Sequence, residues 1–409
     1  MSSEIESRTD GCRPLRGILA ASLLRRLLNC VEHGRLVVRT PEGDTLERQS
    51  GRPGPEGMLV LHRWRAIRRM LAGGDVAFAE AYVEGEWSTP DLVALLELAA
   101  VNIDGIDRAA AGSTPVRFLH RLRHMLRANS RRGSRRNIAF HYDLGNDFYR
   151  LWLDPGMLYS SALYEKPTDT LEEAQENKLR RIGELLDLSP GQSVLEIGCG
   201  WGALAARMAS AGALVKGITL SAEQLAHART LVEKNGLSES MRFELEDYRD
   251  TDGSFDRVVS IEMFEAVGEQ YWPTYFDTLR RLLKGDGHAV LQIISIHESR
   301  FDGYRRGADF IQRHIFPGGM LPTGTIIRRL AQEHGFSLVS AENFGGSYAL
   351  TLAEWRRRFQ RNWPAIQRLG FDQRFRRLWE YYLAYCEAGF RAGTIDVGLY
   401  VLKPEAEYG

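Results

Sequence analysis

The residues with the clearest chemical potential form a glycine-rich stretch that follows an apolar run. Residues 193–197 are mostly apolar, and Gly198, Gly200 and Gly202 follow at alternate positions. Glycine lets the chain turn sharply and leaves no side chain between the backbone and a ligand. A helix expected at 203–209 would begin at this turn, where unpaired N–H groups favour an acidic or polar ligand. The pattern predicts a loop that binds a nucleotide-like ligand, although a tight turn without a ligand has the same pattern.

The spacing around this loop favours one kind of cofactor. A dinucleotide-binding loop reads G-x-G-x-x-G and is followed, about 20 residues later, by an acidic residue that holds the ribose. Here the pattern is E-x-G-x-G-x-G, and the next expected strand, 214–219, leads into Leu220 and Ser221 without an acid. The loop resembles that of class I methyltransferases, which bind S-adenosylmethionine.

Further polar residues stand where the apolar runs after this loop end. Strand-like runs at 193–197, 214–219, 241–246, 257–263, 288–296, 337–343 and 397–402 alternate with helical patterns at 170–186, 203–209, 222–235, 271–283 and 323–334. Such repeated units predict an α/β fold with a parallel, doubly wound, Rossmann-like sheet, in which ligands bind at the carboxyl ends of the strands. The residues at those ends are Gly198, Thr219, Asp247, Glu262 with Glu265, and Gln292.

The first part of the chain has the pattern of a small α+β domain without a recognisable catalytic group. Its expected strands lie at 35–40 and 58–64, its helices at 15–30, 76–82, 92–101 and from 64 to 70, and its turns at 73–75 and 84–91. The organisation predicted for the chain is an N-terminal domain at 1–125, a basic linker at 126–137 and a second domain at 138–409.

Residues 117–136 carry eight arginines and no acidic residue, with apolar residues at helical spacing. A basic amphipathic helix is typical of an element that lies on an anionic membrane surface. A linker helix with solvated arginines has the same pattern, and both interpretations stay open. Because the whole chain has 53 basic and 53 acidic residues, no nucleic-acid partner is expected.

The composition places the chain in a broad class. Its four cysteines are scattered without the spacing of metal ligands, so we expect free thiols in a reducing compartment and no metal site. No apolar run approaches the roughly 20 residues of a membrane-spanning helix. We therefore expect a cytoplasmic protein that is at most peripheral to the inner face of a membrane.

Two segments are expected to cover the site. Residues 141–162 are dense in polar and aromatic side chains ahead of a helix, and residues 355–392 have the pattern of a helical cap rich in arginine and aromatic residues. Ordinary turns and amphipathic packing would produce the same patterns.

Several stretches together carry a resemblance to a known family. They read HYDLGNDFY, LDPGMLYSSALY, VLEIGCGWG, GITLSAEQ, DYRD, FDRVVSIEMFEAVG, IFPGGMLP and GTIDVGLYVLK. From about residue 141 to its end, the chain resembles the cyclopropane-fatty-acyl-phospholipid synthases, which include the mycolic-acid cyclopropane synthases. The stretch GDVAFAEAYVEGEWSTPDL resembles the N-terminal lipid-engaging domain of the members that act on phospholipids.

The resemblance implies a reaction and its ligands. A methyl group from S-adenosylmethionine would be added to the cis double bond of an unsaturated acyl chain of a membrane phospholipid, and a cyclopropane ring would form. A homodimer and an anionic membrane surface are the expected partners besides the lipid. Contacts to S-adenosylmethionine are implied, together with the glycine loop, at Tyr159, Ser160, Gly198, Gly200, Gly202, Thr219, Leu220, Gln224, Asp247 and Tyr248.

The family uses a bound bicarbonate as the base, held by a cysteine, a glutamate, a histidine, an isoleucine backbone and a tyrosine. The resemblance carries three of these onto the chain, as Glu265, Ile294 and Tyr348, but Ser161 replaces the cysteine and Gln292 the histidine. Serine and glutamine can still donate hydrogen bonds to a small anion. Glu262 adds a carboxylate that would weaken anion binding or act as the base itself, and a salt bridge to an arginine is the alternative interpretation of this residue.

The five positions that would hold the bicarbonate base form what we call the base pocket. Because two of them carry other residues than in the family, reaction products other than a cyclopropane stay possible. The same cation on the acyl chain gives a cyclopropane when the new methyl group loses a proton and the ring closes, and a methyl-branched or methylene chain when a proton is lost without ring closure. Ring closure is the first expectation and methylation without closure the second. A small-molecule methyltransferase and a catalytically silent lipid- or cofactor-binding protein are the alternatives from other classes.

Overall fold

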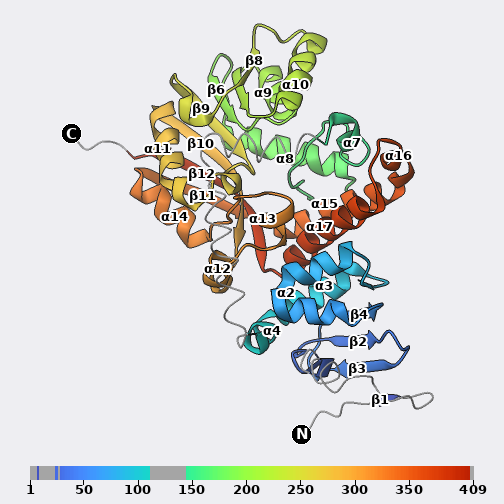
Figure 1. Ribbon diagram of the computed structural model, residues 1–409. Helices are drawn as coiled ribbons and strands as arrows, with labels where there is room; N and C mark the ends of the chain where they lie inside the picture. The colour runs from blue at the N-terminus through green and yellow to red at the C-terminus, as the bar shows by residue number, and fades with distance from the viewer. Residues whose placement is uncertain (1–6, 9–23, 26–27, 111–143, 406–409) are drawn as a thin grey trace.

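The computed structural model describes residues 7–8, 24–25, 28–110 and 144–405, and within them the chain forms two β-sheets (Figure 1). The predicted basic segment at 117–136, the linker at 126–137, residues 141–143 of the first family motif and most of the helix predicted at 15–30 lie outside the described residues.

The larger sheet has seven strands in the order β11-β12-β10-β9-β6-β7-β8. The strands are β6 (Ser193–Ile197), β7 (Leu214–Thr219), β8 (Met241–Leu245), β9 (Phe255–Ile261), β10 (Leu283–Ile296), β11 (Phe336–Asn343) and β12 (Ile395–Pro404). Every strand predicted for this half of the chain is present. The expectation of a fully parallel sheet is wrong at β12, which runs antiparallel to both β10 and β11. A strand that is buried on both faces has the same apolar pattern in either direction, so the pattern alone does not reveal this reversal.

Helices cover both faces of this sheet because its central strands are apolar on both sides. In β6, Val194 packs into one core cluster, and Leu195 and Ile197 pack into another. The first cluster contains residues of α8 (Leu171–Leu186), α9 (Ala203–Ser210) and α10 (Ala222–Asn235). The second contains residues of α11 (Trp272–Leu282) and α14 (Gly324–Glu333). The sheet is therefore the middle layer of an α/β fold, as predicted.

The smaller sheet has five strands in the order β1-β3-β2-β4-β5. They are β1 (Ser7–Arg8), β2 (Arg35–Arg39), β3 (Thr45–Gln49), β4 (Glu56–Leu61) and β5 (Trp87–Ser88), accompanied by α2 (Arg65–Val83), α3 (Leu92–Val101) and α4 (Ile103–Ala110). The predicted turn at 73–75 appears as a kink in α2, where Gly74 has a φ of 67°. The sequence analysis missed β3 because its residues are mostly polar, and it assigned β5 to a turn.

The C-terminal region joins the two sheets. The segment predicted as one helical cap is divided into α15 (Gly345–Arg361), α16 (Trp363–Arg368) and α17 (Gln373–Arg391). Figure 1 shows α17 reaching from the larger sheet to the N-terminal helices, and α17 packs against α2 and α3. The remaining short helices are α7 (Asn146–Arg150), α12 (Glu298–Arg305), α13 (Phe310–His314), and the 3-10 turns Tyr248–Asp250, Phe264–Ala266 and Glu269–Tyr271. None of the described helices has the length and hydropathy needed to cross a bilayer.

Candidate active site

Within the described part of the chain, a large cavity of about 1620 Å³ runs from the carboxyl edge of the larger sheet to the helices of the N-terminal domain. Its wall includes the glycine-rich loop after β6 at one end and residues of α3 at the other. Most of the predicted site residues line it: Tyr159, Ser160, Gly198, Gly200, Thr219, Leu220, Gln224, Tyr248, Glu262, Glu265, Ile294 and Tyr348. The fold thus gathers at one place residues that are separated by up to half of the chain.

The three glycines of the loop, Gly198, Gly200 and Gly202, differ in what surrounds them. All three have positive φ angles, which L side chains rarely adopt. A Cβ on Gly200 would meet no atom within 4 Å, so the backbone of Gly200 faces open space. A Cβ on Gly202 would lie 2.9 Å from the ring of Phe243, so Gly202 serves the packing of α9 and does not line the cavity.

The end of β7 and the start of α10 are fixed to each other through side chains. The hydroxyl of Thr219 donates to Oε1 of Gln224 at 2.8 Å, and Ser221 caps α10 by accepting from the backbone N–H of Gln224. Thr219 and Gln224 are buried and face the cavity. This pairing holds both polar groups in a set orientation beside the glycine loop.

The two residues after β8 that were predicted to contact the ligand, Asp247 and Tyr248, have different surroundings. The carboxylate of Asp247 accepts from the backbone N–H, Nε and Nη2 of Arg249, and Asp247 does not line the cavity. Tyr248 does line it, and burial raises the pKa of its hydroxyl. Of the two residues predicted to contact the ligand, Tyr248 lines the cavity, whereas the negative charge of Asp247 is held by the neighbouring guanidinium of Arg249.

Sequence reasoning missed the buried lysine beside Ser160. Nζ of Lys178 donates to Oγ of Ser160 at 2.8 Å, and Lys178 is only 1% exposed. Burial lowers the pKa of Lys178 to about 8, against the charges of Glu262, Asp154 and Glu196. The signal was available, since position 178 falls on the face of α8 that also carries the buried residues Leu171, Ala174, Gln175, Leu179 and Ile182.

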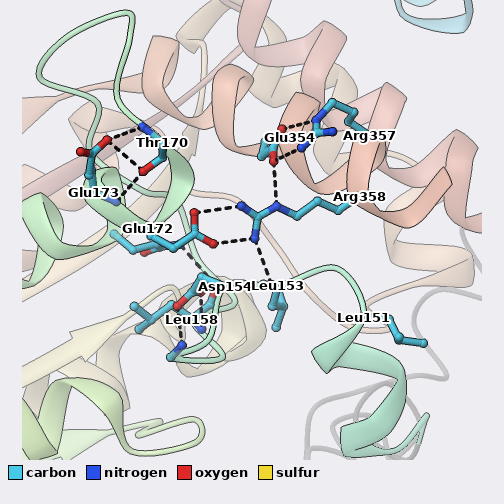
Figure 2. Close-up of polar contacts among 12 residues, drawn as sticks. Leu151, Leu153, Asp154, Leu158, Thr170, Glu172, Glu173, Glu354, Arg357 and Arg358 are labelled. Carbon is cyan, nitrogen blue, oxygen red and sulfur yellow. Dashed lines mark hydrogen bonds and ion pairs between the residues drawn. The ribbon is translucent and has the colours of Figure 1, made fainter. Parts of the chain in front are cut away.

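The segment that carries Tyr159, Ser160 and Ser161 is anchored to α8 and α15 (Figure 2). Asp154 accepts from the backbone N–H groups of Gly156 and Leu158 at 2.7 and 2.9 Å. Arg358 of α15 donates to the carbonyl of Leu153 and pairs with Glu172 of α8. These bonds fix the turn that presents Tyr159, whose hydroxyl lies 2.7 Å from that of Tyr382.

Glu262, directly after β9, collects three hydrogen bonds. Its Oε1 accepts from the backbone N–H of Ser161 at 2.8 Å and from Nε2 of Gln292 at 2.7 Å. Its Oε2 accepts from the hydroxyl of Tyr348 at 2.7 Å. Ser161 and Gln292 are fully buried and do not line the cavity. The alternative interpretation of Glu262 as an arginine salt bridge is wrong, because its hydrogen-bond partners among the described residues are an amide, a backbone N–H and a phenol, and Lys178 is the basic group that acts on its charge.

The hydroxyl of Ser161 has a different role from the one that the resemblance implied. It donates to the carbonyl of Ala162 at 2.9 Å, so only the backbone of Ser161 reaches toward the base pocket.

Glu265 has the other carboxyl group of the pocket. Its Oε1 accepts from the backbone N–H of Ile294, while its buried Oε2 has no partner among the described residues. Burial and the neighbouring charge of Glu262 raise the pKa of Glu265 to about 8. One oxygen of a basic carboxyl group is thus available on the cavity side of β10.

The residues around the glycine loop fit S-adenosylmethionine. The open backbone at Gly200, the oriented Thr219 and Gln224, and the polar groups of Ser160 and Lys178 supply partners for a polar, zwitterionic ligand. The base pocket does not fit bicarbonate. The N–H of Ser161, the amide of Gln292 and the hydroxyl of Tyr348 donate to Glu262, and the N–H of Ile294 donates to Glu265.

Comparisons with known proteins agree with this geometry. The family model described as mycolic acid cyclopropane synthetase matches residues 129–399. Tuberculostearic acid methyltransferase of Mycobacterium tuberculosis is 41% identical over 363 residues, which cover 85% of this chain and 83% of that protein. Cyclopropane-fatty-acyl-phospholipid synthase of Escherichia coli is 37% identical over 350 residues, which cover 84% of this chain and 87% of that protein.

Solved structures extend the likeness to the fold. A mycolic acid cyclopropane synthase in complex with SAH and CTAB superposes with a TM-score of 0.62 at 33% identity, covering 66% of this chain and 97% of that one. Coclaurine N-methyltransferase, at 20% identity and a TM-score of 0.61, shares the fold alone.

Proposed function

The chain belongs to the mycolic acid cyclopropane synthetase family of S-adenosylmethionine-dependent methyltransferases, and we propose that it methylates the cis double bond of an unsaturated acyl chain carried by a membrane phospholipid. The observation that carries the proposal is the continuous cavity. It joins the glycine loop to the apolar interior of the N-terminal domain, so that a long chain can lie beside the methyl donor.

The lining of the cavity beyond the glycine loop suits an acyl chain. Aliphatic and aromatic residues from both domains form this part of the wall, among them Leu95, Leu96, Leu98, Ile294, Ile296, Phe316 and Met320. Apolar surface that is removed from water contributes about 25 cal/mol per Å², so the binding energy of a long chain comes from this wall. A small polar substrate would leave most of it unused.

Residues that line the cavity can stabilise the positive charge that develops on the acyl chain during methylation. When bound, S-adenosylmethionine supplies an electrophilic methyl group, and methylation of a double bond leaves positive charge on the acyl chain. The carboxylates of Glu262 and Glu265 and the ring faces of Tyr159 and Tyr348 line the same cavity, and both kinds of group stabilise a cation in a site that excludes water. We infer that Oε2 of Glu265, which has no partner among the described residues, takes the proton that the cation loses.

The filled base pocket favours methylation without ring closure. Because the donors expected to hold bicarbonate donate to Glu262 instead, we infer that the proton acceptor is Glu265, whose Oε2 has no partner among the described residues. We infer that a carbon of the acyl chain beside the cation loses its proton, which gives a methyl-branched chain that keeps a double bond. The relative at 41% identity is named a tuberculostearic acid methyltransferase, which supports this outcome.

Ring closure is the second candidate outcome. The matched family model and the relative from Escherichia coli are both named for cyclopropane formation. Glu265 would then take its proton from the new methyl group, and the chain carbons would close the ring. Both outcomes add one CH₂ to the acyl chain, so mass alone does not separate them.

The place of action is a further part of the proposal. We infer that the enzyme works at the inner, anionic face of a membrane, with its N-terminal domain engaging lipid, and that it can act as a homodimer. The basic, amphipathic pattern of residues 117–136 supports the membrane contact, since each nearby cation adds about 1 kcal/mol of attraction to anionic head groups.

The test is methyl transfer to lipid vesicles. Purified protein is incubated with methyl-labelled S-adenosylmethionine and vesicles of an unsaturated phospholipid, with vesicles of the saturated lipid and the free unsaturated fatty acid as controls. We expect label in the acyl chains of the unsaturated phospholipid and background label in the saturated lipid. S-adenosylmethionine binding without transfer to lipid would contradict the proposal and would favour a silent binding protein or a small-molecule methyltransferase.

A further inference from the structure

Three donors from distant parts of the chain converge on one carboxylate. The backbone N–H of Ser161, the amide of Gln292 and the hydroxyl of Tyr348 all donate to Glu262, at 2.7–2.8 Å. Ser161, Gln292 and Tyr348 are also positions at which the family resemblance places the holders of a bicarbonate ion. The same set of donors therefore already surrounds a carboxylate, and that carboxylate is part of the chain.

The backbone at Glu262 has an unusual conformation that fits this role. Glu262 has a φ of 50°, in the left-handed region that L residues other than glycine, asparagine and aspartate rarely adopt. Its backbone N–H still donates to the carbonyl of Gln292, so the position lies at the end of β9 beside β10. A glycine would adopt this conformation without strain. The side chain is held there by its three hydrogen bonds.

The surroundings supply a counter-charge for this carboxylate. Burial raises the pKa of Glu262, and its three hydrogen bonds together with the charge of the buried Lys178, which donates to Ser160, act against that shift. Glu265 is the neighbouring acid, and the charge of Glu262 raises the pKa of Glu265. Glu262 is thus the carboxylate that the pocket holds by hydrogen bonds, and Glu265 is the one that keeps an oxygen without a partner.

We propose that the side chain of Glu262 is a built-in anion that takes the place of free bicarbonate, so that this enzyme neither binds nor needs that ion. The inference rests on the proposed methyl transfer to acyl chains. Glu262 supplies the negative charge at the anion position and orients Tyr348, while the proton goes to Glu265.

The variant Glu262→Gly tests this by removing the side chain and leaving its donors. Because glycine adopts the positive φ without strain, we expect the variant to fold; three donors lose their acceptor, so its melting temperature should fall and should rise again when bicarbonate is added. Glu262→Gln is the matched control, because its neutral amide keeps the pocket full. Each protein is assayed for labelled-methyl transfer in buffer stripped of carbon dioxide and again with bicarbonate added.

The three proteins should differ in how their rates of methyl transfer respond to bicarbonate. The wild type works equally well in both buffers, and Glu262→Gly loses roughly 100-fold in rate without bicarbonate, as for removal of a preorganised electrostatic partner, and recovers when bicarbonate is added. Glu262→Gln is slow in both buffers. A wild type that needs bicarbonate, or a Glu262→Gly variant that keeps full activity without it, would overturn the inference.

A binding measurement separates this inference from the proposed function. Titration of ¹³C-labelled bicarbonate, followed by NMR, should show binding to Glu262→Gly and none to the wild type. If no protein labels lipid under any condition, the proposed function fails, and the titration still decides whether Glu262 fills an anion site. Bicarbonate binding to the wild type would refute the inference even if methyl transfer succeeds.

Discussion

At the scale of single residues, the site depends on two neighbouring acids whose surroundings differ. Glu262 receives three hydrogen bonds, whereas Glu265 receives the backbone N–H of Ile294 on one oxygen and keeps the other without a described partner. Paired carboxyl groups in unlike surroundings commonly divide their tasks in this way. Here one acid holds charge in place and the other can exchange a proton.

The substitution Glu265→Gln should abolish most of the activity. Burial and Glu262 raise the pKa of Glu265 to about 8, so the free enzyme holds the base form above that pH. We expect kcat/KM of the wild type to rise as the pH increases through about 8, and the variant to lose roughly 10²- to 10⁴-fold, the range for a general base. The pH profile of methyl transfer measures both, with Glu333→Gln on the exposed end of α14 as the control.

The same raised pKa has a consequence for stability. The ionised form of Glu265 is disfavoured in the folded protein, so the protein should lose stability as the pH rises from the ordinary value of 4.5 through about 8. Denaturation of Glu265→Gln over this range should show a weaker dependence on pH. An equal dependence in both proteins would place the perturbed group elsewhere.

Individual roles were predictable only where a motif fixed them. The positions of Glu265, Ile294 and Tyr348 followed from the family motifs, and the structure brings them to one cavity. The pairing of Asp247 with Arg249, the turning of the Ser161 hydroxyl and the burial of Lys178 could not be read from spacing, because each depends on how side chains pack in three dimensions.

At the scale of elements, the segment that presents Tyr159 to Ser161 has little regular structure and relies on its neighbours. Arg358 of α15 bridges Glu172 of α8, Glu354 of its own helix and the carbonyl of Leu153 (Figure 2). Its side chain is 17% exposed, so this network is partly shielded from water and salt. The site is therefore assembled by α8 and α15 together.

A comparison of the variants Arg358→Ala and Arg357→Ala tests whether Arg358 holds this segment in place. Arg357 shares Glu354 as its partner but is 56% exposed and reaches no other element in the described contacts. Loss of Arg358 should lower the free energy of unfolding by about 1–3 kcal/mol and weaken S-adenosylmethionine binding, whereas loss of Arg357 should cost less than about 0.5 kcal/mol. Urea denaturation and calorimetric titration measure these effects, and equal losses in both variants would contradict the bridging role.

Most elements followed from periodicity, and the errors have physical causes. The boundaries of α3 and α10 agree with the prediction because apolar spacing and capping residues coincide there. The long helical segment at 355–392 was not predicted as three helices, although Pro364 lies in the first turn of α16 and Gly370, with a φ of 100°, precedes α17. Composition averaged over such a stretch hides single breaking residues.

At the scale of the whole molecule, the cavity makes the two sheets one functional unit. Residues from the N-terminal helices, from α17 and from the strand ends of the larger sheet all line it. The sequence predicted two domains, but it gave no sign that their interiors are connected, because a cavity between domains depends on how their surfaces meet.

A large side chain at the N-terminal end of the cavity should weaken the use of the lipid substrate and leave the binding of S-adenosylmethionine unchanged. Ala99 of α3 lines the cavity and is partly exposed. In Ala99→Trp, we expect kcat/KM for a long-chain phospholipid to fall about tenfold or more, since overpacking costs about 1–3 kcal/mol, with unchanged S-adenosylmethionine affinity. Ala226→Trp, at an exposed position of α10, is the control. Equal lipid kinetics in the two variants would show that the chain does not extend to α3.

The central claim, that a carboxylate of the chain replaces the external anion and redirects the proton, is tested most directly by the structure of the product. Proton NMR of the acyl chains after reaction with S-adenosylmethionine and an unsaturated phospholipid distinguishes the outcomes. We expect branched-methyl signals and a changed set of vinylic signals, neither of which is found in the starting lipid or after incubation with Glu265→Gln. Cyclopropyl signals as the main product would contradict it and would return the proton-abstracting base to the side of the new methyl group.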